Sequence, residues 1–153
     1  MTAEILAILS KYGESTTEAL RAKTPKATGK TAQSLRFEVT EEETKATLRI
    51  LGKPFYMVVQ TGRRPTPQFT KPSKTFVASI QEWMDAKGIQ SSAYAIAKSI
   101  HKKGTKLWQQ GGNTLVSDIV NQTLVDEISK ETLSVFAHEY LISTVKMFDD
   151  NRN

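Results

Sequence analysis

The sequence predicts an α+β fold: an N-terminal helix, an antiparallel β-hairpin or small sheet with packed helices, and a long C-terminal helical segment. Three observations predict it. Apolar residues recur at helical spacing before residue 24, alternate with polar residues between 35 and 51, and return to helical spacing after 72. The chain of 153 residues suits one hydrophobic core. We expect residues 1–110 to form the α+β body and residues 111–153 a C-terminal helical extension.

The first helix is predicted from Thr2 to about Lys23. Gly13 lies inside it and weakens or kinks it, at a cost of about 1 kcal/mol relative to alanine. Pro25 ends it, because the residue before a proline is pushed out of the helical region. The residues that recur at helical spacing are Ile5, Ile8, Leu9, Tyr12, Thr16 and Leu20.

A β-hairpin is predicted from Leu35 to Leu51. On both arms apolar residues alternate with polar ones, as in strands with one buried and one solvated face. Residues Glu41 to Thr44 form the turn, without the Asn-Gly or Asp-Gly pair that would fix a tight type. The inward-facing residues are Leu35, Phe37, Val39, Ala46, Leu48 and Ile50.

The apolar run Phe55–Val59 comes next, and its pattern fits either a buried strand or a helical turn. After Gly62 comes a basic loop, residues 63–72, which its three prolines stiffen. We expect the cations on or beside this loop to contact a neighbouring subunit or DNA. These cations are Arg63, Arg64, Lys71 and Lys74.

A second helix is predicted from residue 72 or 73 to Gly88, and a third from residue 91 or 92 to Gly104. Near the end of the third helix the cations complement the helix dipole and form a positive cluster. The members of this cluster are Lys98, His101, Lys102, Lys103 and Lys106. We interpret both His101 and His138 as surface or helix-end residues.

Residues 109–113 are predicted to form a flexible joint, and residues 114–148 a helix in one or two pieces. A helix this long on so small a body is only half covered by its own domain. We therefore expect the rest of its surface to pack against another subunit. The packing surface is predicted as one stripe formed by Leu124, Val125, Ile128, Val135, Phe136 and Tyr140.

The charge is unevenly spread along the chain. Residues 1–110 contain 18 Lys and Arg against 9 Asp and Glu, a net charge of +9, whereas residues 111–153 contain 3 against 7, a net charge of −4. A basic body with an acidic tail fits a nucleic-acid surface, subunits that meet basic face to acidic face, or simply solvated faces.

The stretch TPKATGKT, residues 24–31, ends like a phosphate-binding loop of the G-x-x-x-x-G-K-[ST] type. The first glycine of that motif is replaced by Thr24, and Pro25 removes a backbone N–H from a loop that works by pointing N–H groups at phosphate. The stretch also follows a helix and precedes a strand, the reverse of the order the motif requires. Nucleotide binding is therefore not predicted here.

No enzyme, cofactor or metal site is predicted. The chain has no cysteine, its two histidines lie 37 positions apart, and it has no G-x-S-x-G sequence. His138 and Glu139 lack the second histidine of a zinc motif, and Glu41–Glu43 fit a solvated turn better than a cation site. No apolar run approaches the roughly 18 residues that span a bilayer, so no membrane partner is expected.

The order of features resembles the minor tail or tail-completion proteins of tailed bacteriophages, the head–tail joining (neck) family. That pattern runs roughly T-P-x-x-T-G-x-L-x-x-S, a hairpin, Y-x-x-x-x-E-x-G-T, a loop with proline and phenylalanine, and a helix. The resemblance covers about residues 1–87. Thr31 stands where leucine is usual, and Gln60-Thr61 replaces the usual glutamate. The matching residues are Thr24, Pro25, Thr28, Gly29, Ser34, Tyr56 and Gly62.

This resemblance implies a structural virion protein at the head–tail interface, made in the host cytoplasm and found in the neck or tail of the virion. It would form a homo-oligomeric ring that joins the portal–adaptor stack to the tail, with the adaptor, tail tube or terminator as neighbours. DNA passing through the lumen would be a further partner.

The alternative is a nonspecific DNA-binding protein that uses the basic loop. Its cations would hold phosphates, and Phe69 beside them would stack on a base. No helix-turn-helix, β-ribbon or RNP signature accompanies them, so a sequence-specific regulator is not predicted.

Overall fold

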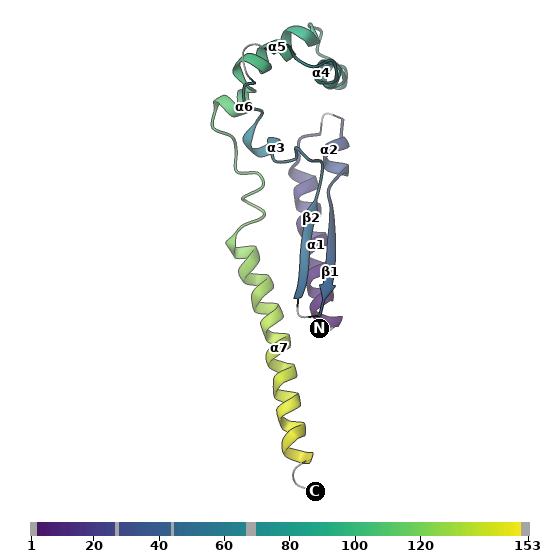
Figure 1. Ribbon diagram of the computed structural model, residues 1–153, viewed down its shortest axis with the longest axis vertical. Helices are drawn as coiled ribbons and strands as arrows, with labels where there is room; N and C mark the ends of the chain where they lie inside the picture. Colours follow the sequence, from purple (N-terminus) through teal and green to yellow (C-terminus); the bar gives the residue numbers. More distant parts are fainter. Residues whose placement is uncertain (1–2, 27, 44, 67–69, 151–153) are drawn as a thin grey trace. The chain divides into compact units, whose positions relative to one another are not determined.

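The protein is described from a computed structural model that covers residues 3–26, 28–43, 45–66 and 70–150, without the side chains of 144–150. It has the predicted α+β composition, with a two-stranded antiparallel sheet and helices before and after it (Figure 1). The elements in order are α1 (Ala3–Lys23), α2 (Lys30–Gln33), β1 (Arg36–Glu42), β2 (Lys45–Leu51), α3 (Val58–Thr61), α4 (Lys74–Lys87), α5 (Ala93–Lys103), α6 (Lys106–Gln109) and α7 (Gln122–Asp150).

The chain forms two compact units, and each contains segments distant in sequence. The hairpin unit comprises residues 1–19, 36–51 and 119–153, and so holds most of α1, the hairpin and α7. The helical unit comprises residues 20–35 and 52–118, with the last turn of α1 and helices α2 to α6. The predicted division into an α+β body, residues 1–110, and a C-terminal helical extension, residues 111–153, stays a prediction.

The hairpin unit has its core between α1, the hairpin and α7. Ile5 and Leu9 of α1 are buried together with Val135 of α7. The partly buried residues packed against them are Ile8, Val39, Ala46, Leu48 and Ile128. In the hairpin Phe37 lies opposite Ile50 and Val39 opposite Leu48. The inward face that the alternation predicts on these two strands is therefore confirmed, while Leu35 precedes β1 and is buried in the helical unit.

Gly13 lies where α1 packs against the side chains of the hairpin. A Cβ atom placed on it would lie 2.5 Å from Cδ2 of Phe37 and 2.8 Å from Cδ1 of Leu48. α1 continues through this position from Ala3 to Lys23. The glycine that the sequence marks as a weak point of the helix thus provides the space in which the aromatic ring packs.

A polar cluster joins α1 to α7. Lys11 Nζ donates to both carboxylate oxygens of Glu131 at 2.9 Å, and the hydroxyl of Tyr12 donates to Oε1 at 2.7 Å. The hydrogen bond from Lys11, followed by that from Tyr12, holds the pKa of Glu131 below its ordinary value of 4.5. The hydrogen bond to Glu131, together with burial, raises the pKa of Tyr12 to about 12.

We expect Glu131→Gln to remove a pH-dependent part of the stability. A lowered carboxyl pKa stabilises the fold above the pKa of the unfolded chain, and this contribution is lost as the pH falls through the folded-state value. The difference in melting temperature between wild type and variant should therefore be present at pH 7 and shrink below about pH 4.5. Melts between pH 3 and 7 check this, and a difference independent of pH would contradict it. Because the pKa of Tyr12 is raised from 10.0 to about 12, we expect the wild-type protein also to lose stability as the pH rises from about 10 to about 12.

The long helix α7 begins later than the sequence predicts. Residues 115–121 form turns and bends, and Asn121 Oδ1 accepts a hydrogen bond from the N–H of Leu124 at 3.0 Å, which starts the helix at Gln122. The residues predicted to form one stripe differ in burial, because they span a wide sector of the helix. Val135 is buried and Leu124 and Ile128 are half-buried, but Val125, Phe136 and Tyr140 are exposed.

In the helical unit, α4 packs against α5. The side chain of Ser73 caps α4 by accepting from the N–H of Phe76, and that of Ser92 caps α5 by accepting from the N–H of Ala95. The predicted boundaries at Gly88 and Gly104 are confirmed by their positions as C-caps. Of the two interpretations of the run at 55–59, the helical turn is correct, since α3 begins at Val58.

The segment predicted to be a flexible joint is held against α3. The N–H of Asn113 donates to the carbonyl of Gln60 at 2.9 Å, and its side-chain amide donates to the carbonyl of Val59 at 3.2 Å. Oε1 of Gln60 also accepts from the N–H groups of Val116 and Ser117. These hydrogen bonds depend on contacts between residues more than 50 positions apart, which the local composition does not reveal.

Candidate functional site

The two units carry opposite charge. The ranges of the helical unit contain 14 Lys and Arg against 3 Asp and Glu, which gives +11, whereas those of the hairpin unit contain 7 against 13, which gives −6. The two values together give the net charge of +5 of the whole chain. The charge is thus divided between the structural units more sharply than along the sequence, and the helical unit is the part of the protein suited to a negatively charged partner.

Three of the residues that carry the family resemblance, Thr24, Ser34 and Tyr56, lie at a corner that follows the end of α1. Thr24 is buried, its hydroxyl donates to the carbonyl of Leu20 at 2.6 Å, and it lies 2.8 Å from the hydroxyl of Tyr56. Ser34 donates to the carbonyl of Thr31 and accepts from the N–H of Lys53 at 3.2 Å. These hydrogen bonds join the segment that precedes the hairpin in the sequence to the segment that follows it.

The other motif residues have more varied positions. Gly29, with φ of 76°, is the N-cap of α2 and has a left-handed backbone conformation that favours glycine. Pro25 and Thr28 are exposed. Gly62 is the C-cap of α3, with φ of 73° and ψ of 170°.

The cations of the basic loop do not form one site. The guanidinium of Arg63 lies 3.6 Å from the centre of the Phe76 ring, and its backbone N–H donates to Oγ1 of Thr105. Arg64 is exposed beside it, and Lys74 is the first residue of α4. Lys71 lines a different pocket. Phe69, expected to stack on a base, lies outside the described residues.

The two arginines border what we call the arginine groove. It has a volume of about 660 Å³, and its apolar lining comes from α3, α4, α5 and the residues before α3. The lining residues used below are Phe55, Val58, Arg63, Arg64, Phe76 and Ile80. An apolar floor with cations at the edge fits an apolar segment that carries acidic residues.

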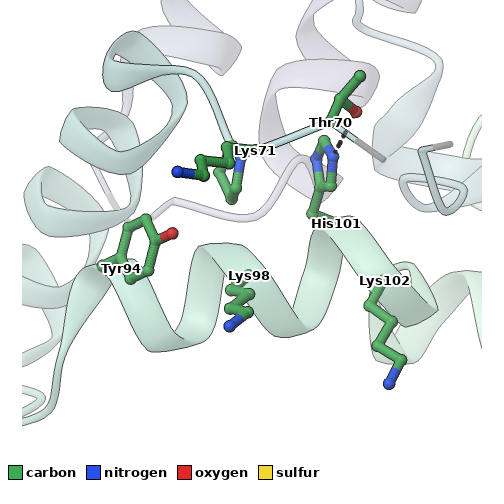
Figure 2. A pocket seen from close by; sticks show the side chains of 7 residues that line it. Thr70, Lys71, Tyr94, Lys98, His101 and Lys102 are labelled. Atoms are coloured by element: carbon green, nitrogen blue, oxygen red, sulfur yellow. Dashed lines mark hydrogen bonds between the residues drawn. The ribbon is translucent and has the colours of Figure 1, made fainter. Parts of the chain in front are cut away.

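A second pocket, which we call the lysine pocket, lies between α5 and the segment before α4. Its volume is about 450 Å³, and Lys71, Lys98 and Lys102 line it together with Tyr94. Figure 2 shows Lys98 and Lys102 extending from one face of α5, away from the ring of His101. Tyr94, Lys98 and Lys102 are each separated by about one turn of α5, so an aromatic ring and two cations form a row along the helix.

His101 fixes one wall of the lysine pocket. Only 8% of its surface is exposed, and its Nδ1 and Nε2 lie 2.7 Å and 2.8 Å from the hydroxyls of Thr66 and Thr70. Figure 2 shows the contact with Thr70. His101 lies in the last turn of α5 and is buried. The sequence predicted a surface or helix-end residue, and the helix end is the correct one of these two positions. The role of Tyr94 was also missed, because no local pattern relates it to Lys71.

The described residues offer binding surfaces more clearly than reactive groups. Among them, no three His, Cys, Asp or Glu side chains lie together in a way that could hold a metal ion. In the same part of the chain, no helix combines the length and the apolar character needed to cross a membrane. No protein-family model, curated protein or solved structure matches this chain.

Proposed function

We propose that this chain is a structural virion protein of a tailed bacteriophage, located at the head–tail interface. In this proposal it forms a ring that joins the portal–adaptor stack to the tail. Its neighbours are other copies of itself and the adaptor, tail tube or terminator, and DNA passes through the lumen. The protein acts by binding, without catalysis and without a cofactor.

The observation that carries the proposal is the corner around Thr24. Thr24 and Tyr56 lie 32 positions apart, and both are residues on which the resemblance to tail-completion proteins depends. Ser34, a third such residue, ties the same corner through Lys53. Residues that match a family pattern and also contact one another support a shared local architecture better than scattered matches would.

The test is quantitative mass spectrometry of purified virions that carry the gene for this protein. We expect the protein to co-purify with particles through a density gradient, at a fixed copy number per portal ring. Electron microscopy of particles lacking it should show full heads without joined tails. A protein abundant in infected cells but absent from washed virions would contradict the proposal.

The second candidate, a nonspecific DNA-binding protein, is favoured by the lysine pocket and by the charge of +11 on the helical unit. Lysines in a row on an exposed helix face suit the regularly spaced phosphates of a nucleic acid. Duplex DNA has a higher charge density than a single strand, so each phosphate contact with duplex DNA releases more counterions.

We expect Lys98→Glu combined with Lys102→Glu to weaken binding of duplex DNA and to reduce its salt dependence by about one unit per lost phosphate contact. Fluorescence anisotropy over a salt series measures both quantities. Lys26→Glu combined with Lys87→Glu, outside the pocket, is the control with the same change of net charge. Equal losses in the two double variants would show that total charge, not the pocket, governs binding. Tight DNA binding by a monomer absent from virions would favour the second candidate over the first.

A further inference from the structure

The helix α7 presents two apolar stripes. The first packs into the core of the hairpin unit through Ile128 and Val135, and Leu124 on the same face is half-buried. The second is turned by about 100° and is exposed, with Val125 at 49%, Leu133 at 65% and Phe136 at 50%. Large apolar side chains aligned on one face of a helix are more than the scattered exposure of ordinary surfaces, and they mark an interaction site.

The dimensions and charge of the second stripe define its partner. From Val125 to Tyr140, which is 72% exposed, the stripe runs for about 22 Å. Asp126 lies at its N-terminal end and accepts a hydrogen bond from Gln122. The partner must therefore offer apolar surface with positive charge beside it.

Pairing of two α7 helices does not meet this requirement. Each α7 belongs to a unit with a net charge of −6, so pairing would bring like charges together. The arginine groove of the helical unit does meet it. Val58, Phe76 and Ile80 supply apolar lining, Arg63 is held over Phe76, and Phe55 is 82% exposed at the same pocket.

We propose that the exposed stripe of α7 in one copy docks into the arginine groove of the helical unit of a second copy. This inference rests on the proposed ring, for which it supplies the contact. The groove volume of about 660 Å³ has room for the apolar side chains that a helix places in such a site. Because the stripe and the groove are different surfaces, the contact is heterologous and repeats from copy to copy until it closes into a ring.

The absence of cysteine from the chain makes disulfide trapping a clean test. A tagged Phe55→Cys protein and an untagged Leu133→Cys protein are mixed and mildly oxidised. We expect a disulfide-linked heterodimer that carries one tag, formed at least tenfold faster than with the controls. One control replaces Phe55→Cys by Tyr94→Cys, at the lysine pocket, and the other replaces Leu133→Cys by Ser134→Cys, outside the stripe.

Three results would overturn the inference. The first is no heterodimer above the controls. The second is equal trapping with a control cysteine, which would indicate random collision. The third comes from a single chain that carries both Phe55→Cys and Leu133→Cys: fast closure within a monomer at high dilution would show that α7 covers its own groove.

The assembly type is measured on the trapped material. Native mass spectrometry of the double-cysteine chain at high concentration should give one closed oligomer of three or more copies. A closed dimer would mean reciprocal exchange of α7 and would contradict the ring while supporting the docking. This test uses purified protein, so its failure is distinguishable from absence of the protein from virions, which would defeat the proposed function itself.

Discussion

Gly62→Ala is expected to destabilise the helical unit by about 3–5 kcal/mol, the largest effect of any conservative substitution we predict. Gly62 has φ of 73° and ψ of 170°, a backbone conformation that essentially only glycine adopts. A Cβ atom there would also lie 2.4 Å from the backbone nitrogen of Trp108 and 2.7 Å from Oγ1 of Thr105. Backbone atoms cannot move aside as the end of a flexible side chain can, so α6 would have to leave α3.

The matched control is Gly88→Ala. Gly88 also has a positive φ, of 66°, but nothing lies within 4 Å of a Cβ atom placed on it. It should therefore cost only the left-handed backbone term, about 1–2 kcal/mol. Urea unfolding of the two variants, followed by circular dichroism, separates the backbone term from the clash. Equal losses in both variants would contradict the close approach of α6.

The sequence predicts well the features that depend on neighbours along the chain. The alternation around Val39 and Leu48 defined the inner face of the hairpin, because each strand meets one apolar and one aqueous side. Ser73 and Ser92 marked two helix starts through a hydrogen bond that spans only three residues. In these cases the physical cause lies within the segment that was read.

The sequence fails where the cause lies elsewhere in the fold. On α7, helical spacing placed Val135 and Phe136 in one packing surface, although they are successive residues that differ by 100° around the axis. Helical spacing indicates that an apolar residue lies on a packing face. It does not indicate whether the surface that covers this face belongs to the same chain or to another one. The burial of His101 likewise depends on the hydroxyls of Thr66 and Thr70, more than 30 positions away.

The basic loop shows how this affects the candidate site. The sequence predicts that its cations form one group, which contacts either a neighbouring subunit or DNA. In the structure Arg63 and Arg64 border an apolar groove, while Lys71 lines a pocket with Lys98 and Lys102. The two partners need not compete for one surface, since a helix with an acidic residue suits the first and phosphates suit the second.

Gly13→Leu is expected to reduce the stability of the hairpin unit by about 3 kcal/mol or more, because overpacking forces side chains out of their rotamers and separates the packed elements. The new side chain would start 2.5 Å from the ring of Phe37 and 2.8 Å from Leu48, at the site where α1 meets the hairpin. Leucine is a better helix former than glycine by somewhat less than about 1 kcal/mol, so the local effect opposes the clash.

Glu14→Leu, at the exposed neighbouring position, is the control and should change stability by no more than about 0.5 kcal/mol. Gly13→Ala should fall between the two, since a single methyl group meets the same ring but also gains helix propensity. Chemical denaturation of the three variants at equal protein concentration gives the order. A Gly13→Leu protein as stable as wild type would show that α1 does not pack on the hairpin at this point.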